Sequence, residues 1–266
     1  MNSDTKLPSK PLGSSTRNQW QVQRDSCDLV RNPSLIHAVT LPAQPQNITI
    51  DLARTALIII DMQNDFCHPQ GWLGSIGVDT QLACSPIVPL QKLLPKLRRA
   101  NVPILWVNWG NRPDKINLSP SLLHVYSNDG VSTGLGDALA TVPLSQLKSN
   151  KVLEKDSWGA AVVSPLEQHS NDVSIDKFRM SGFYDTCLDS ALRNLDVKTI
   201  LFAGVNADQC VLATLMDANF LGYDCVFLED CCATTSPDFC RQATVYNVRQ
   251  CFGFTADSRD LCDQIN

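Results

Sequence analysis

The chain has 266 residues, enough for one large α/β domain with a buried core. Its net charge of −5 argues against a nucleic-acid partner, because proteins that bind phosphate backbones normally carry a basic surface. The 11 cysteines are odd in number and irregularly spaced, so they predict neither a disulfide framework nor a zinc-finger site. We interpret most of these thiols as small buried side chains in a reducing compartment.

The N-terminal region contains no apolar run of signal-peptide length. The strongest apolar run, at 56–60, is far too short to span a membrane. The sequence therefore predicts a cytoplasmic protein with no membrane partner. Residues 1–50 are polar and contain several prolines, so we interpret them as an extended arm that precedes one domain at 51–266.

Strands and helices are predicted to alternate along this domain. The continuous apolar run at 55–60 is typical of a parallel strand that is buried on both faces. Leucines at helical spacing predict a helix at 86–100, and a second strand follows at 103–108. The later elements are strands at 173–176, 198–203 and 225–228, and helices at 186–195, 209–221 and 237–250. This alternation predicts right-handed βαβ units and a mainly parallel sheet with helices on both faces. The intervening segment at 110–150 is rich in Gly, Ser, Asn and Asp, and we interpret it as a lid or an oligomer contact.

Three polar residues stand near the carboxyl ends of predicted strands. Asp61 directly follows the first strand, Lys177 follows the strand at 173–176, and Cys210 opens the helix after the strand at 198–203. Ligands of parallel α/β sheets bind beyond these strand ends. We therefore expect Asp61, Lys177 and Cys210 to converge on one cleft.

These three residue types together are suited to nucleophilic catalysis. Unpaired amides at a helix N-terminus and a neighbouring ammonium such as Lys177 both favour a thiolate, so we expect the pKa of Cys210 to be lowered. Asp61 is placed to take the thiol proton and to deliver it later to a departing amine, while amides of the turn before Cys210 serve as an oxyanion hole. Taken singly, each residue has a structural alternative: a turn or cap, an exposed lysine, and a core thiol.

Histidine-based chemistry has no support in the sequence. There is no GxSxG motif of the kind that carries a catalytic serine. His37, His124 and His169 lie in polar segments, and we interpret His68, just after the first strand, as a loop residue.

Three motifs in this order resemble the isochorismatase-like cysteine hydrolase superfamily. They are TALIIIDMQNDF at 55–66, KFRMSGF at 177–183 and GVNADQCVLAT at 204–214. The resemblance covers about 52–260 and implies an isochorismatase-like hydrolase domain at 51–266. It also implies a three-layer αβα sandwich with a six-stranded, mostly parallel sheet, assembled as a homodimer or homotetramer.

The resemblance assigns roles to individual residues. It places the catalytic triad on Asp61, Lys177 and Cys210, and the oxyanion donors on the backbone amides of Asn206 and Cys210. It also implies a non-proline cis peptide bond between Val205 and Asn206. From their positions beside the catalytic segments, we predict a pocket wall formed by Asn64, Asp65, Trp109, Arg179, Phe183 and Tyr184.

The motifs also bear on the reaction. Nicotinamidases of the superfamily hold a metal with an Asp and two His, but the stretch WVNWGNRPD at 106–114 has no histidine, so we predict no metal and no cofactor. True isochorismatases need no cysteine nucleophile. The stretch SGFYDTCLDS at 181–190 looks more like ureidoacrylate, biuret and N-carbamoyl amidohydrolases. The expected activity is cleavage of a C–N bond in a small ureido, carbamoyl or primary amide substrate through a thioester. The alternatives are a vinyl ether hydrolase of the isochorismatase type and an inactive family member that acts as a binding protein.

Overall fold

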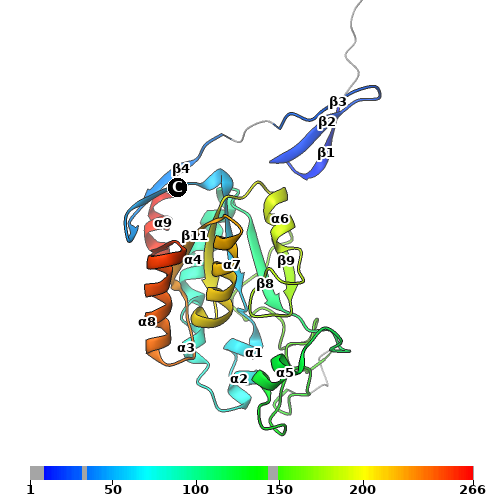
Figure 1. The fold of residues 1–266 in the computed structure, drawn as a ribbon, viewed down its shortest axis with the longest axis vertical. Helices are drawn as coiled ribbons and strands as arrows, with labels where there is room; N and C mark the ends of the chain where they lie inside the picture. The colour runs from blue at the N-terminus through cyan, green and yellow to red at the C-terminus, as the bar shows by residue number, and fades with distance from the viewer. Residues whose placement is uncertain (1–8, 32–34, 143–148, 266) are drawn as a thin grey trace, which may run out of the picture.

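One large sheet forms the centre of the protein in the computed structural model, which describes residues 9–31, 35–142 and 149–265 (Figure 1). The sheet has seven strands in the order β5-β12-β11-β10-β7-β8-β9. All neighbours pair in parallel except β5, which is antiparallel to β12. The strands are β5 (Ala43–Gln44), β7 (Thr55–Ile60), β8 (Ile104–Trp109), β9 (Val173–Lys177), β10 (Thr199–Gly204), β11 (Asp224–Cys232) and β12 (Phe254–Ala256).

The predicted α/β fold with a mostly parallel sheet is confirmed, with one strand more than the six expected. The additional strand, β5, is only two residues long and lies between Pro42 and Pro45. Such a short segment has no detectable period-2 pattern, so its pairing with β12 depends on tertiary contacts. In the middle of the sheet, every residue of β7 and β10 is buried, as the apolar runs at 55–60 and 198–203 predict.

Helices cover both faces of this sheet. Figure 1 shows α7 (Leu212–Phe220) in front of the central strands and α4 (Ile87–Arg99) behind them. The buried residues of α4 are its leucines at helical spacing, which pack towards the core. The remaining helices are α1 (Asn64–Cys67), α2 (Trp72–Ser75), α3 (Gln81–Cys84), α5 (Pro120–Tyr126), α6 (Leu188–Asn194), α8 (Asp238–Asn247) and α9 (Ser258–Gln264), with short 3₁₀ or π turns at Leu52–Arg54, Ala207–Val211 and Val248–Phe252.

The N-terminal segment contains more regular structure than an extended arm. Strands β1 (Lys10–Ser15), β2 (Asn18–Val22) and β3 (Cys27–Asp28) form a small antiparallel sheet that stands apart from the main body in Figure 1. It contacts the body through Arg17, which donates a hydrogen bond to the carbonyl of Asn101 at 2.6 Å. The following strands, β4 (Ala38–Leu41) and β6 (Ile48–Asp51), pair with each other and contribute buried residues to the core. The division into residues 1–50 and 51–266 stays a prediction.

The long connection between β8 and β9 spans 110–172, and within its described residues it contains one helix, α5. The segment at 110–150, predicted to be a lid or an oligomer contact, lies within this connection. Its residues 143–148 fall outside the described residues, and its role stays a prediction. Figure 1 places α5 beside α1 and α2, at the end of the molecule opposite the β1–β3 sheet. Because α1 directly follows the carboxyl end of β7, this connection lies at the edge of the sheet where ligands are expected.

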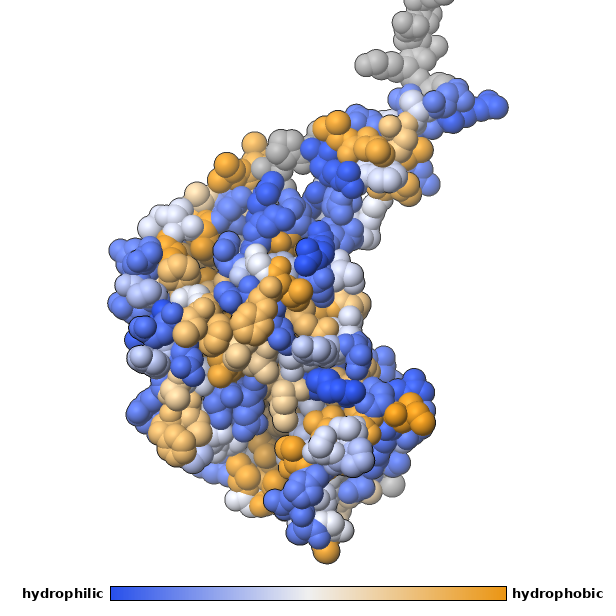
Figure 2. Space-filling view, in the orientation of Figure 1, coloured by the Kyte–Doolittle hydropathy of each residue, from blue (hydrophilic) through white to orange (hydrophobic). Residues whose placement is uncertain are grey.

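The visible surface combines polar and apolar residues. Figure 2 shows apolar residues gathered over α7, and Phe220 and Leu221 at its carboxyl end are 66% and 43% exposed. No helix in the described ranges is both long enough and apolar enough to cross a membrane.

Gly204 is required where β10 ends beside β7. Its φ is +118°, and a Cβ atom there would lie 2.0 Å from the carbonyl oxygen of Ile60. Gly222 also has a positive φ, +89°, but a Cβ atom there would meet nothing within 4 Å. We expect Gly222→Ala to lower the free energy of unfolding by about 1 kcal/mol through backbone strain. Gly204→Ala should lower it by about 2 kcal/mol more because of the clash.

Urea denaturation of the two variants measures this difference, and Gly222→Ala is the matched control for strain alone. Equal losses in both variants would show that the close approach of β10 to β7 does not limit the residue at position 204.

Candidate active site

Asp61, Lys177 and Cys210 meet beyond the carboxyl ends of three strands. Lys177 ends β9, Asp61 follows β7, and Cys210 lies in the π-helical turn after β10. The Nζ atom of Lys177 is 2.9 Å from Oδ2 of Asp61 and 3.3 Å from Sγ of Cys210. Asp61 and Lys177 are fully buried, and Cys210 is 4% exposed. The predicted convergence of these three side chains is therefore confirmed.

Backbone contacts fix the orientation of the Asp61 carboxylate. Asp61 has a φ of +53°, and its Oδ1 accepts a hydrogen bond from the amide of Trp109 at 3.0 Å. The neighbouring Gln63 accepts from the same amide at 2.9 Å and donates to the carbonyl of Trp109 at 2.8 Å. The other carboxylate oxygen, Oδ2, accepts no well-aligned hydrogen bond from the described residues, although it faces Lys177. Among the described residues, this oxygen is therefore held by the charge of Lys177.

The Lys177 ammonium is held on several sides. Besides Asp61 and Cys210, it donates a hydrogen bond to the carbonyl of Arg179 at 3.0 Å. It also lies 3.8 Å from the centre of the Trp109 ring, in a cation–π contact. A buried ammonium is stable only when it is paired and hydrogen-bonded in this way. Lys177 is thus a fixed positive charge between the carboxylate and the thiol.

The electrostatic environment favours the neutral thiol of Cys210. Burial raises the pKa of Cys210 to about 12, with Lys177 lowering it and Asp61 raising it further. Burial also raises the pKa of Asp61 above its ordinary value, and Lys177 offsets part of this effect. The prediction of a lowered pKa for Cys210 is therefore wrong. The attraction of the Lys177 ammonium does not outweigh the removal of the thiol from water.

The turn before Cys210 is tightly held. The peptide bond between Val205 and Asn206 is cis, as expected from the resemblance. The amide of Ala207 donates to the carbonyl of Ala233 at 2.8 Å, and Oδ1 of Asn206 accepts from the amide of Thr235 at 3.2 Å. The amide of Asn206 itself has no hydrogen-bond acceptor among the described residues. It remains a candidate donor to a ligand beside Cys210.

Comparison with known proteins agrees with this geometry. The isochorismatase domain family matches residues 55–260. The chain belongs to this family. It is 33% identical over 230 residues to a ureidoacrylate amidohydrolase from Rhizobium rhizogenes, covering 86% of this chain and 90% of that protein.

Two solved structures also resemble this isochorismatase-family chain. A cysteine hydrolase from Pseudomonas syringae pv. phaseolicola has a TM-score of 0.66 and 26% identity, covering 81% of this chain and 94% of the other. The N-carbamoylsarcosine amidase of Thermoplasma acidophilum has a TM-score of 0.58 and 24% identity, covering 77% and 96%, and supports the fold alone.

Three of the predicted pocket residues lie close to Lys177 or contact the connection between β8 and β9. The Trp109 ring contacts Lys177, as described above. Asn64 donates a hydrogen bond to the carbonyl of Trp158 at 2.8 Å. Both carboxylate oxygens of Asp65 are occupied, by the amides of Trp72 and Leu153 at 3.1 and 2.7 Å. Burial raises the pKa of Asp65 to about 6, against the lowering effect of these two bonds. Asn64 and Asp65 therefore hold the connection in place, and a substrate role for either stays a prediction.

The other three predicted pocket residues follow Lys177 along the chain. The guanidinium of Arg179 donates to the carbonyls of Phe178 and Asn117, both at 2.8 Å. Phe183 is partly buried, with its ring centre 6.2 Å from that of Tyr223, whereas Tyr184 is 61% exposed. Their contact with substrate stays a prediction.

Several residues near the centre were not predicted from the sequence. Gln63 and Met180 lie inside two of the motifs, and Sδ of Met180 is 3.6 Å from Sγ of Cys210. Motif membership was the signal that could have identified them. Tyr126 lies in the long connection, where no motif marks it, and its ring centre is 5.5 Å from that of Trp109.

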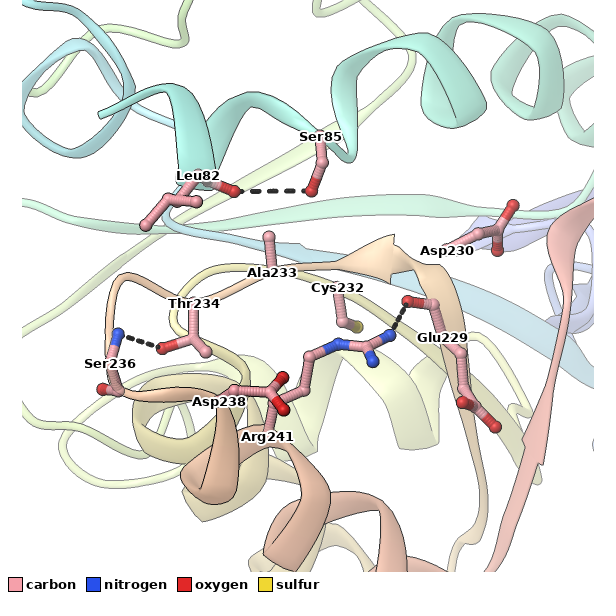
Figure 3. Close-up of a pocket in the computed structure, with 10 residues that line it drawn as sticks. All are labelled: Leu82, Ser85, Glu229, Asp230, Cys232, Ala233, Thr234, Ser236, Asp238 and Arg241. Atoms are coloured by element: carbon pink, nitrogen blue, oxygen red, sulfur yellow. Dashed lines mark hydrogen bonds between the residues drawn. The ribbon is translucent and has the colours of Figure 1, made fainter. Parts of the chain in front are cut away.

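A cavity of about 450 Å³ lies beside the catalytic turn, at the carboxyl end of β11 (Figure 3). Thr234 and Ser236 line it and also hydrogen-bond to Asp208 and Gln209 of that turn. Figure 3 shows Arg241 reaching across the cavity to the carbonyl of Glu229, at 3.0 Å. Its lining residues are Leu82, Ser85, Glu229, Asp230, Cys232, Ala233, Thr234, Ser236, Asp238 and Arg241.

Groups of His, Cys, Asp and Glu that could hold a metal ion are absent from the described residues. The prediction of no metal and no cofactor rests on the sequence and stays a prediction.

Lys177 should control the reactivity of Cys210. Its positive charge lowers the pKa of Cys210 against the effect of burial, so losing the ammonium should raise that pKa. We expect Lys177→Met to slow alkylation of Cys210 by iodoacetamide at least about tenfold near pH 8, since each pKa unit changes the thiolate fraction about tenfold.

Timed labelling with peptide mapping measures this rate. Lys155→Met is the matched control, because Lys155 is an exposed lysine paired with Asp176 at 2.6 Å. If both variants label Cys210 at the wild-type rate, the ammonium does not activate the thiol.

Proposed function

We propose that this chain is a cysteine-dependent amidohydrolase. Its substrate is a small ureido, carbamoyl or primary amide compound, and cleavage of a C–N bond releases ammonia or an amine. The observation that carries the proposal is the Lys177 ammonium within 3.3 Å of the Cys210 thiol and 2.9 Å of the Asp61 carboxylate in a buried site. The match to a ureidoacrylate amidohydrolase over most of both chains supports the substrate class.

The proposed reaction proceeds in two halves. Asp61 accepts the Cys210 thiol proton while Sγ attacks the substrate carbonyl carbon. The tetrahedral intermediate collapses as the C–N bond breaks, Asp61 returns the proton to the leaving nitrogen, and a thioester remains. Asp61 then takes a proton from water, the hydroxide attacks the thioester, and Cys210 leaves and regains its proton. The products are ammonia or an amine and a carboxylic or carbamic acid.

The raised pKa values fit this sequence of proton transfers. Because the thiol of Cys210 is neutral and Asp61 is ionised, the thiol proton passes to Asp61 as Sγ attacks the substrate. Lys177 offsets the negative charge, which passes from carboxylate to sulfur to the carbonyl oxygen. We propose that the backbone amides of Asn206 and Cys210 donate hydrogen bonds to the developing oxyanion. Such bonds are more effective in a buried site than in water.

The remaining aspects of the function are carried over as proposals. The partner is a small amide or ureide molecule that Trp109, Arg179, Phe183 and Tyr184 help to enclose. Assembly as a homodimer or homotetramer and residence in the cytoplasm are expectations from the sequence and the resemblance.

Replacing the nucleophile should abolish turnover without unfolding the protein. We expect Cys210→Ala and Cys210→Ser to lower kcat at least about a thousandfold, because no thioester can form. Ammonia release from a panel of ureides and primary amides measures the activity, and mass spectrometry of the wild type detects the acyl adduct. Cys251→Ala, which removes an exposed thiol, is the matched control.

A cyclic vinyl ether assayed beside the panel separates the alternatives. Hydrolysis of this ether that is retained in Cys210→Ala would favour the vinyl ether hydrolase. A wild-type protein that turns over neither the ether nor any member of the panel, and forms no adduct, would instead be a binding protein.

Activity should fall on the acid side as Asp61 takes up a proton. Because burial raises the pKa of Asp61 above its ordinary 3.8, the midpoint of this acid limb should lie above about pH 4. Below the midpoint, kcat/KM should fall about tenfold per pH unit. The profile is measured by ammonia release, with a return to neutral pH to exclude irreversible unfolding.

Asp65 also has a raised pKa and could cause the same acid limb. The Asp65→Asn variant shows which of the two carboxyl groups is responsible. The acid limb should persist in this variant. Its disappearance there would assign the limb to Asp65 and remove the support for Asp61 as the base.

A further inference from the structure

Tyr126 lies one aromatic ring away from the catalytic ammonium. It is the last residue of α5 and is 7% exposed. Its ring packs between Trp72 and Trp109, with ring centres 4.8 and 5.5 Å away. Trp109 in turn lies over the Nζ atom of Lys177. The long connection between β8 and β9 thereby places Tyr126 beside the reacting groups.

No hydrogen bond joins the Tyr126 hydroxyl to another described residue, and the side chain keeps 7% of its surface exposed. The indole Nε1 of Trp109 is buried and has no hydrogen-bond partner within the described ranges. Buried polar groups are normally paired, and leaving one unpaired is unfavourable. Two neighbouring aromatic rings beside Lys177 therefore each carry a donor that the protein leaves unused, which indicates a place for a ligand atom that accepts hydrogen bonds.

The surroundings keep Tyr126 in its protonated form. Burial raises the pKa of the Tyr126 hydroxyl, and negative charge on Cys210 and Asp61 raises it further. The hydroxyl therefore keeps its proton at neutral pH and is a hydrogen-bond donor.

Three other polar side chains near the centre are already engaged by the protein. Gln63 is paired with the backbone of Trp109, Asp65 with two amides, and the guanidinium of Arg179 with two carbonyls. Tyr126 and Trp109 are the groups of this set that still have a donor to offer.

We propose that Tyr126 is a substrate-binding residue whose hydroxyl donates a hydrogen bond to an acceptor oxygen on the substrate. This oxygen, of a carbonyl or a carboxylate, belongs to the substituent beyond the scissile C–N bond, since the scissile carbonyl is assigned to the amides of Asn206 and Cys210. The proposal rests on the proposed amidohydrolase function and adds a requirement for a second acceptor group. A simple alkylurea lacks such a group.

Three compounds distinguish the acceptors. 3-Ureidopropionate carries a carboxylate, acetylurea carries a second carbonyl, and propylurea carries neither. Dissociation constants are measured by calorimetry in the Cys210→Ala background, and kcat and KM in the protein with Cys210 intact. Tyr126→Phe keeps the ring and its packing, so it removes only the hydroxyl. Tyr246→Phe, at a 63% exposed tyrosine on α8, is the matched control.

The expected result is a loss confined to acceptor-bearing compounds. Tyr126→Phe should raise the dissociation constant and KM for 3-ureidopropionate or acetylurea about tenfold or more, and those for propylurea less than about twofold. Tyr246→Phe should change none of them. A larger effect on 3-ureidopropionate identifies a carboxylate as the preferred acceptor, and a larger effect on acetylurea identifies a carbonyl.

Three results would overturn the proposal. The first is an equal effect of Tyr126→Phe on all three compounds, which would indicate loss of packing only. The second is a Tyr126→Phe variant that matches Tyr246→Phe, which leaves the amidohydrolase function intact. The third is a wild-type protein that neither binds nor hydrolyses any ureide, which rejects the proposed function together with this inference.

Discussion

The structure of the site depends on one buried ammonium. Lys177 has no contact with solvent and lies between the Asp61 carboxylate and the Cys210 thiol. Removing either charge of the Lys177–Asp61 pair would leave its partner buried and unpaired, which is strongly unfavourable. The surrounding contacts, from the carbonyl of Arg179 to the Trp109 ring, serve to keep this charge in place. In this arrangement burial keeps the Cys210 thiol in its neutral form beside the ion pair.

The parallel sheet is what makes this arrangement possible. Strands β9, β8, β7 and β10 are neighbours, so their carboxyl ends bring together residues that are far apart in the chain. Gly204 allows β10 to end directly against Ile60 of β7, and the turn that follows carries Asn206 and Cys210. Backbone geometry at the strand ends thus sets the distances between the side chains of Asp61, Lys177 and Cys210.

The long connection after β8 closes the site from the other side. Asn64 and Asp65 bind its backbone at Trp158 and Leu153, and α5 supplies Tyr126. The motif at 55–66 therefore has two separate tasks: Asp61 pairs with Lys177 beside the thiol, and Asn64 and Asp65 anchor the connection. Polar residues a few positions apart in one motif can therefore contact different parts of the protein, because their side chains point into different surroundings.

Local patterns in the sequence determined the order of the strands and helices, the mostly parallel sheet and the meeting of Asp61, Lys177 and Cys210. Hydrophobic periodicity is a local property, and parallel strands bring their carboxyl ends together whatever the details of packing. Only the tertiary structure decided the seventh strand, the anchoring role of Asp65, the raised pKa of Cys210 and the position of Tyr126. Each of these depends on burial and on contacts between segments far apart in the chain, which no local pattern of residues records.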